Sequence, residues 1–269
     1  MNGFIPWVRE SWNIYKYRFV PWIALNINEK TSKVIKKNEL VPEVDLLRSL
    51  QSCLQSFHQY TSLRDDLSLY EDLYVRNQKV LLQSLGFSIV RSKSLIPGAG
   101  KGVLILKGAA SRGSIVCLYP GVVYQPYQPI LIQSIRNQFL FRCADGVLVD
   151  GKDKSISRSI YRSCAGRDQI GLIRVCDTSW LTPRPVNPLN VGQFVNNESK
   201  QFPANVAYLE LNLPSTFPLQ LRKFIPNINF DSISLDGERE LRIIALVALR
   251  DIVAGEELFS SYFTLISDS

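Results

Sequence analysis

After Gly86 the chain consists largely of short apolar runs separated by glycine and proline, and this pattern limits the folds open to it. Pairs such as Lys107-Gly108 and Arg112-Gly113 are typical of turns. Many short strands separated in this way favour a mostly β body over alternating β and α units. The runs expected to form strands are Phe87–Val90, Gly102–Leu106, Ser114–Leu118, Gly146–Val149, Ala204–Leu209 and Leu241–Leu249.

Before Gly86 the apolar residues recur at helical spacing instead. Two helices are predicted there. The second of them runs from Asp65 or Asp66 to Leu85, with acids in its first turn and Gly86 as its C-terminal cap. Residues 1–40 are first aromatic-rich and then basic and polar, which we interpret as a short arm followed by a mobile segment. The overall class is therefore expected to be α+β, with a helical N-terminal region. The first helix is predicted from Pro42 to Tyr60, on the positions Leu46, Leu47, Leu50, Leu54 and Phe57.

Composition excludes several classes of protein. The 269 residues, 46% of them hydrophobic, fit one large domain or one domain with an appendage. The net charge of +7 is spread along the chain, which does not indicate specific nucleic-acid binding. The apolar run from Ile243 to Leu249 is far shorter than the roughly 20 residues of a membrane span. Charged residues near the N-terminus, at Arg9 and Glu10, argue against export, so we expect an intracellular protein, nuclear or cytoplasmic.

The chain has a single histidine, His58, for which we expect a packing role on the first predicted helix. A catalytic triad would need this residue as its base, and no GxSxG motif accompanies it. The five cysteines are scattered and odd in number, which favours reduced thiols and gives no zinc-binding spacing. No metal site is predicted, and any catalysis must proceed without imidazole.

The glycine-rich segment Gly98-Ala99-Gly100-Lys101-Gly102 leads into the predicted strand that begins at Gly102. Phosphate-binding loops lead into a helix instead, so both the P-loop and the dinucleotide-binding interpretations fail here. One interpretation is a plain turn. The other is that a backbone without side chains lets a ligand approach closely.

Two later segments bear on this choice. Gln193-Phe194-Val195-Asn196-Asn197 is followed by Asn205, and asparagines near a strand ordinarily form turns. Near the C-terminus, Leu249–Tyr262 contains a predicted strand end, the turn residue Gly255, two adjacent acids and Tyr262, which would ordinarily be a core residue.

In this order and at these separations, the three segments resemble SET-domain protein lysine methyltransferases, from about Ser92 to Thr264. The resemblance implies S-adenosyl-L-methionine as cofactor and a protein substrate with an accessible lysine. It makes Tyr262 a catalytic residue that lines the methyl-transfer channel. It also makes Tyr119, otherwise an ordinary turn tyrosine, a candidate for the wall of that channel. The cofactor-binding residues that it implies are Ala99, Gly100, Lys101, Gly102, Asn196, Asn197 and Tyr262.

The resemblance also implies an architecture. Residues 1–91 would form the helical N-terminal region and residues 92–264 a SET-type fold of small curled sheets, with an insertion at about 124–188 and a short tail at 265–269. A knot-like crossing is expected near the C-terminus. No membrane contact is expected, and nucleic acid would be met only indirectly, through chromatin.

Departures from the family pattern keep other functions open. Gln193 stands in place of an arginine, Asn197 in place of a histidine and Ser261 in place of an aspartate. One alternative is therefore a catalytically weak or inactive SET-fold module that binds proteins. Another is a β-rich scaffold without a cofactor.

Overall fold

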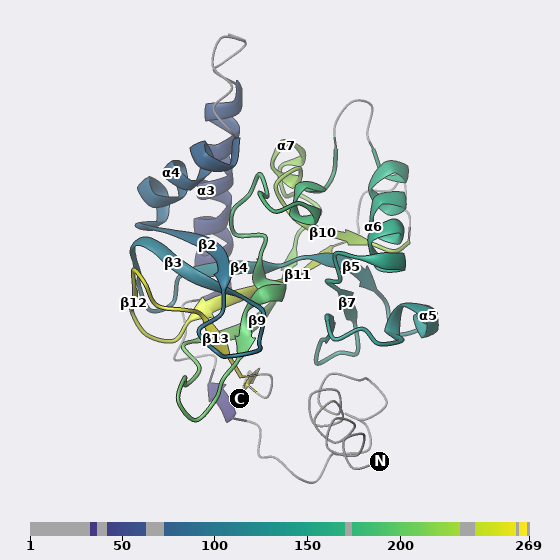
Figure 1. The fold of residues 1–269 in the computed structure, drawn as a ribbon. Coiled ribbons are helices and arrows are strands. Elements are labelled where there is room, and N and C mark those ends of the chain that lie inside the picture. Colours follow the sequence, from purple (N-terminus) through teal and green to yellow (C-terminus); the bar gives the residue numbers. More distant parts are fainter. Residues whose placement is uncertain are drawn as a thin grey trace, which may run out of the picture.

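The fold combines a pair of helices with several small sheets. The computed structural model describes residues 33–36, 42–62, 73–169, 174–231, 240–261 and 264–267. In Figure 1, helices α3 (Glu43–Ser62) and α4 (Leu73–Leu85) lie beside the sheets, and α6 (Ser155–Arg167) lies on the opposite side. This arrangement confirms the α+β class and the helical N-terminal region. No helix in the described ranges is long and apolar enough to cross a membrane.

Helix α3 begins where its sequence predicts. The carbonyl of Pro42 accepts hydrogen bonds from the backbone amides of Asp45 and Leu46, at 3.0 and 3.1 Å. Helix α4 ends at Leu85, and the φ of +82° at the following Gly86 is the left-handed conformation of a C-terminal cap. The predicted start of this second helix lies outside the described residues, as does the N-terminal arm except for β1 (Lys33–Lys36). The residues that α3 buries are Leu46, Leu50, Cys53, Leu54 and Phe57.

The strands of the described residues form four small sheets. Strands β1 and β14 (Thr264–Ser267) pair in parallel, and so bring the two ends of the described chain together. The three-stranded sheet has the order β12 (Ile252–Val253), β3 (Lys101–Ala110), β2 (Phe87–Lys93). The four-stranded sheet has the order β10 (Asn227–Asn229), β5 (Gly121–Tyr124), β7 (Leu148–Asp150), β6 (Leu140–Arg142). The five-stranded sheet has the order β4 (Ile115–Tyr119), β11 (Leu241–Ala248), β9 (Val206–Leu213), β13 (Phe259–Ser260), β8 (Asn196–Asn197).

Strand β11 is the centre of the main core. It pairs antiparallel with β4 on one side and with β9 on the other. Its residues from Ile243 to Ala248 are fully buried. An uninterrupted apolar run is what a strand buried on both faces requires, because neither face can carry polar side chains.

The interval predicted as an insertion, 124–188, builds a second, smaller core. It contains α5 (Leu131–Ser134), β6, β7, α6 and the short helix η2 (Ser179–Leu181). Tyr161 and Trp180 pack there edge to face, with ring centroids 5.0 Å apart. The Tyr161 hydroxyl donates to the carbonyl of Asp177 at 2.7 Å. The predicted domain boundaries stay predictions, and β2 runs across the one between residues 91 and 92.

The predicted crossing lies where β13 runs parallel to both β8 and β9. The helical turn η3 (Gly192–Phe194), which precedes β8, is packed closely against the main core. A Cβ added at Gly192 would stand 2.8 Å from the carbonyl oxygen of Leu118, closer than real contacts allow. Gly192 is thus packed against β4, and β13 lies beside β8, whereas the knot-like crossing of the two segments stays a prediction.

Candidate functional site

The glycine-rich segment forms a turn before β3. Gly98 and Gly100 both have φ of +80°, a backbone conformation that residues other than glycine rarely adopt. The carbonyl of Gly100 accepts a hydrogen bond from the amide of Ser94 at 3.0 Å, and this bond closes the turn. A Cβ at either glycine would meet nothing within 4 Å. The turn therefore presents bare backbone beside open space.

The buried carboxylate of Glu257 ties this turn to the C-terminal segment. It accepts hydrogen bonds from the Ser94 hydroxyl at 2.8 Å and from the Leu95 amide at 2.6 Å. Glu257 is only 2% exposed, so its charge depends on these donors in place of water. Glu257 is not among the predicted site residues, although the adjacent acids in the motif were the available signal.

Asn196 joins the second segment to the same point. Its side-chain amide donates to the carbonyl of Lys101 at 2.9 Å and to Glu257 Oε1 at 3.1 Å. Gly102 lies against the same carboxylate, because a Cβ there would stand 2.0 Å from Glu257 Oε1. Glycine at 102 thus leaves room for the buried carboxylate, which explains this position without a ligand.

Asn205 forms a second connection between the same segments. Its side chain donates to the Glu257 carbonyl at 2.9 Å and accepts from the Phe259 amide at 2.8 Å. It is 2% exposed, so both ends of its amide are used in the interior. The structure therefore brings together the glycine turn, the asparagine segment and the C-terminal strand.

The other predicted cofactor residues lie around this junction. Ala99, Gly100 and Lys101 are exposed on the turn, and the Lys101 ammonium lies 5.7 Å from the ring centroid of Phe194. Asn197 is half-buried in β8, in register with Ser260 of β13. Tyr262 lies outside the described residues.

Tyr119, the second candidate channel residue, is buried at the end of β4. Its hydroxyl donates to the carbonyl of Phe139 at 2.9 Å. Its ring packs against those of Phe141 and Tyr208, with centroids 5.5 and 6.3 Å away. These contacts give Tyr119 a structural role, and its catalytic role stays a prediction.

Tyr208 is an aromatic residue that the sequence analysis missed. It lies on β9, 6% exposed, and its hydroxyl accepts a hydrogen bond from the Ser260 hydroxyl at 3.1 Å. The Ser260 hydroxyl also lies 3.4 Å from the carbonyl of Asn196. Tyr208 therefore connects the aromatic cluster around Tyr119 to the junction of β13 and β8.

Replacing Tyr119 with phenylalanine tests which role its hydroxyl has. The change removes one of two donors to the Phe139 carbonyl, which also accepts a hydrogen bond from the Gly151 amide at 2.9 Å, so we expect the free energy of unfolding to fall by about 1 kcal/mol or less. Urea denaturation at constant m-value measures this loss. A catalytic hydroxyl would in addition lower the methyl-transfer rate of the fully folded variant by at least about tenfold. A purely structural one would leave that rate unchanged.

Gln193, which replaces the family arginine, is 6% exposed. Neither its amide oxygen nor its amide nitrogen has a hydrogen-bond partner among the described residues. A buried amide left in this state costs about 1–3 kcal/mol. This departure from the family pattern therefore places a buried polar group without a described partner in the segment that carries Asn196.

Cysteine chemistry does not supply a nucleophile. All five cysteines are buried and free. Burial raises the pKa of Cys53 to about 11 and that of Cys176 to about 12, and it raises the pKa of the other three thiols as well. These thiols stay protonated at neutral pH, and the thiol form is a poor nucleophile.

Cys143, Asp145 and Glu210 lie close enough to one another to suggest a metal site. The guanidinium of Arg242 already neutralises both carboxylates, at 2.7 Å from Asp145 and 2.7 Å from Glu210. Burial also raises the pKa of the Cys143 thiol, which disfavours the thiolate that a metal would require. The cluster is therefore an arginine-centred network of ion pairs.

Comparison with known proteins identifies the family. The sequence is 42% identical to SET domain-containing protein 9 of Homo sapiens, across 96% of this chain and 97% of the human protein. It is 44% identical to the Pongo abelii protein of the same name, across 91% and 87% respectively. No family model matches the chain. The chain belongs to the SET-domain proteins and, among them, to the family of SET domain-containing protein 9, which confirms the resemblance.

Solved structures resemble the chain only distantly. Chaetomium thermophilum polycomb repressive complex 2 gives a TM-score of 0.34 at 16% identity, covering 68% of this chain and 16% of that one. KRYPTONITE in complex with mCHG DNA and SAH gives 0.33 at 15% identity, covering 66% of this chain and 24% of that one. The chain spans less than a quarter of the length of each.

Proposed function

We propose that the chain is an S-adenosyl-L-methionine-dependent methyltransferase that modifies a lysine side chain of a protein substrate. The observation that carries the proposal is the meeting of the glycine turn, the Asn196 segment and β13 at the buried carboxylate of Glu257. Membership in the SET domain-containing protein 9 family supports the same class of activity.

The residues at this junction fit the cofactor. The bare backbone at Gly98 and Gly100 allows close approach, since no atom lies within 4 Å of either missing Cβ. Main-chain groups of Ala99, Gly100 and Lys101 would hold the cofactor, with Asn196 and Asn197 beside them on β8. Gly102 would contribute only its backbone, because the side on which a Cβ would lie faces Glu257. When bound, the cofactor supplies a methyl group already activated on a sulfonium, with a neutral leaving group.

The chain itself would contribute alignment and the exclusion of water. The substrate lysine has to be neutral to attack, and its ordinary pKa is about 10.4. A narrow, poorly solvated channel lowers that pKa, because desolvation disfavours the ammonium form. Tyr262 would orient the amine through its hydroxyl, with Tyr119 as a wall of the channel. Neither a histidine base nor a protein nucleophile is needed for this reaction.

A second candidate function is a SET-fold module that binds proteins without efficient catalysis. The observation that favours it is Gln193, buried beside the Asn196 segment with its amide unbonded among the described residues. An arginine could form charge-assisted hydrogen bonds that this glutamine does not. Under this alternative, cofactor binding would persist while methyl transfer would be slow.

One pair of measurements on the full chain tests the proposal. Calorimetric titration with S-adenosyl-L-methionine should show saturable binding, and thermal denaturation should shift upward with cofactor concentration. Transfer of labelled methyl groups to proteins of a cell extract should then yield methyl-lysine on hydrolysis. Binding without transfer would support the module instead. The absence of both cofactor binding and a thermal shift would contradict both functions. It would support the remaining alternative, a β-rich scaffold without a cofactor.

A further inference from the structure

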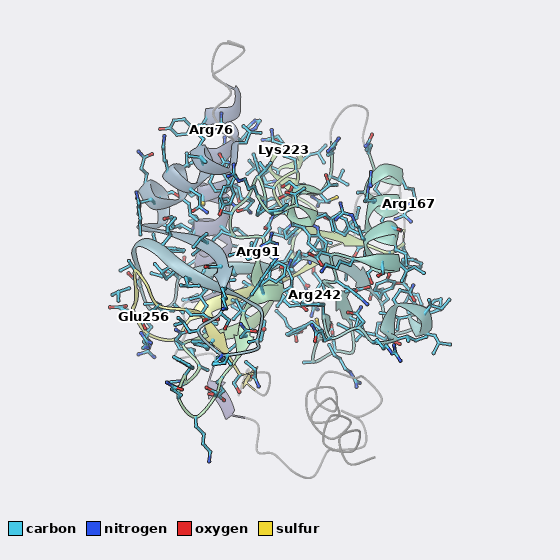
Figure 2. The ribbon with its side chains drawn as sticks, in the orientation of Figure 1. Arg76, Arg91, Arg167, Lys223, Arg242 and Glu256 are labelled. Atoms are coloured by element: carbon cyan, nitrogen blue, oxygen red, sulfur yellow. The ribbon has the colours of Figure 1, made fainter. Side chains whose placement is uncertain are left out.

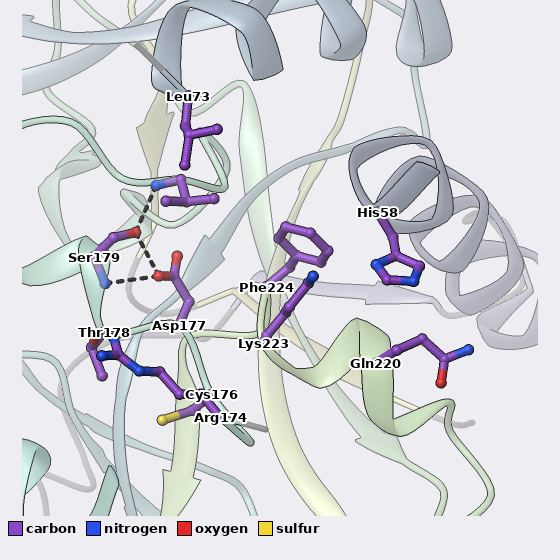
Figure 3. Close-up of a pocket in the computed structure, with 11 residues that line it drawn as sticks. His58, Leu73, Arg174, Cys176, Asp177, Thr178, Ser179, Gln220, Lys223 and Phe224 are labelled. Carbon is purple, nitrogen blue, oxygen red and sulfur yellow. Dashed lines mark hydrogen bonds between the residues drawn. The ribbon is translucent and has the colours of Figure 1, made fainter. Parts of the chain in front are cut away.

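A separate pocket lies on another part of the molecule. It has a volume of about 560 Å³ and lies between helix α3, residues 174–179 and the end of α7 (Leu219–Arg222), as Figure 3 shows in close-up. It shares no lining residue with the junction at Glu257. Its size falls within the range of small-molecule sites, roughly 300–1,000 Å³.

Three basic side chains, among them Lys223 (labelled in Figure 2), lie in the described lining of this pocket. Figure 3 shows Lys223 and His58 directed toward one another, with Phe224 close to the lysine. The Lys223 ammonium lies 5.1 Å from the ring centroid of Phe224. Arg174 contributes a further cation, whose Nη1 donates to the Thr178 hydroxyl at 3.3 Å. In the described part of the chain, no carboxylate forms an ion pair with Lys223 or Arg174.

The surroundings disfavour the charged forms of Lys223 and His58. Burial lowers the pKa of Lys223. Burial, and then the nearby charge of Lys223, lower the pKa of His58. A partly desolvated ammonium group such as that of Lys223 is stabilised by an anion placed beside it.

Asp177, the one acid among the described lining residues, does not meet this need. The carboxylate of Asp177 accepts hydrogen bonds from the backbone amide and hydroxyl of Ser179, at 2.7 and 2.5 Å, and from the Asn190 amide at 2.7 Å. Ser179 in turn accepts a hydrogen bond from the Val186 amide at 2.6 Å. Asp177 therefore holds the pocket wall in place and is committed to neutral donors.

The apolar part of the lining includes Leu73, Val186 and Phe224, beside the neutral polar residues Thr178 and Gln220. We propose that the pocket binds a small organic anion, with its acidic group beside Lys223 and its apolar body against Phe224 and Val186. The acidic group is a carboxylate or a phosphate, since both pair with ammonium and guanidinium groups. A ligand bound there would contact both helix α3 and the end of α7. Its binding does not depend on the proposed methyl transfer.

Binding of four matched fragments to the full chain tests the proposal. Benzoate and phenyl phosphate supply the two acidic groups, benzyl alcohol is the neutral counterpart, and benzylamine is the cationic one. Titration by ligand-observed NMR should give dissociation constants on the order of 1 mM for at least one anion. The neutral and cationic fragments should bind at least about tenfold more weakly. Saturating S-adenosyl-L-methionine should leave anion binding unchanged.

Variants locate the binding. Lys223→Met should weaken anion binding about tenfold, while Lys223→Arg should retain it. Lys107→Met, at an exposed position of β3, is the matched control and should leave binding unchanged. Arg174→Gln provides an independent second variant should Lys223→Met fail to fold. Equal binding of the neutral alcohol, full anion affinity in the folded Lys223 or Arg174 variant, or displacement by S-adenosyl-L-methionine would each overturn the proposal.

Discussion

Replacing Glu257 with alanine is expected to lower the free energy of unfolding by about 3 kcal/mol, whereas the same change at the adjacent Glu256 should cost about 0.5 kcal/mol. The two acids are neighbours in the sequence and differ in their surroundings. Glu257 is 2% exposed and accepts hydrogen bonds from three donors in two distant segments. Glu256 forms an ion pair with Arg250 near the surface, where solvent screens the attraction.

Removal of the Glu257 carboxylate leaves buried donors unpaired. The Ser94 hydroxyl and the Leu95 amide would lose their acceptor, as would one hydrogen of Asn196. The Asn196 side chain would also be less firmly placed against the glycine turn. We therefore expect cofactor affinity to fall by at least about tenfold, measured by calorimetry at a temperature where the variant is folded.

Urea denaturation of the two variants, with m-values compared, separates these expectations. Glu257→Gln is a further control, because it keeps the volume and one acceptor oxygen and should show an intermediate loss. Equal stability losses at 256 and 257 would show that the buried carboxylate does not hold the segments together. Normal cofactor binding by a folded Glu257→Ala variant would remove it from the site.

Local patterns predicted much of the fold. The helical spacing of Leu46, Leu50 and Phe57 indicated the buried face of α3, since side chains three and four positions apart share one side of a helix. Gly86 and the glycine turn were predictable because their backbone conformation requires glycine. The order of the three motifs indicated the family, which the identity to SET domain-containing protein 9 confirms.

Contacts between distant segments were not predictable in the same way. The hydrogen bond from Ser94 to Glu257 joins residues 163 positions apart, and neither residue type specifies its partner. Strand β9 has apolar residues on both faces, so its sequence does not show that Tyr208 would meet Ser260. The pocket at Lys223 depends on how α3 packs against the end of α7, and no local motif encodes that packing.

The largest effect on activity is expected from Tyr262→Phe, which removes one oxygen from the proposed channel. If the hydroxyl orients the neutral amine of the substrate, its loss misplaces that amine in the transition state of methyl transfer. Cofactor binding does not depend on this orientation. We expect kcat to fall by about 10²-fold or more while the dissociation constant of the cofactor changes by less than about threefold. Calorimetry on the variant and single-turnover transfer of labelled methyl groups measure the two quantities separately.

A matched tyrosine makes the outcome specific. Tyr60→Phe alters an exposed tyrosine on α3, 47% accessible, and should leave both binding and turnover unchanged. Raising the pH should not restore the turnover of Tyr262→Phe, because deprotonating more of the substrate lysine does not replace the missing hydroxyl. Turnover of Tyr262→Phe equal to that of the unmodified chain would exclude Tyr262 from the mechanism. A loss of cofactor affinity with unchanged turnover at saturating cofactor would instead assign it to cofactor binding, because an interaction lost equally in the ground and transition states changes affinity without changing the chemical step.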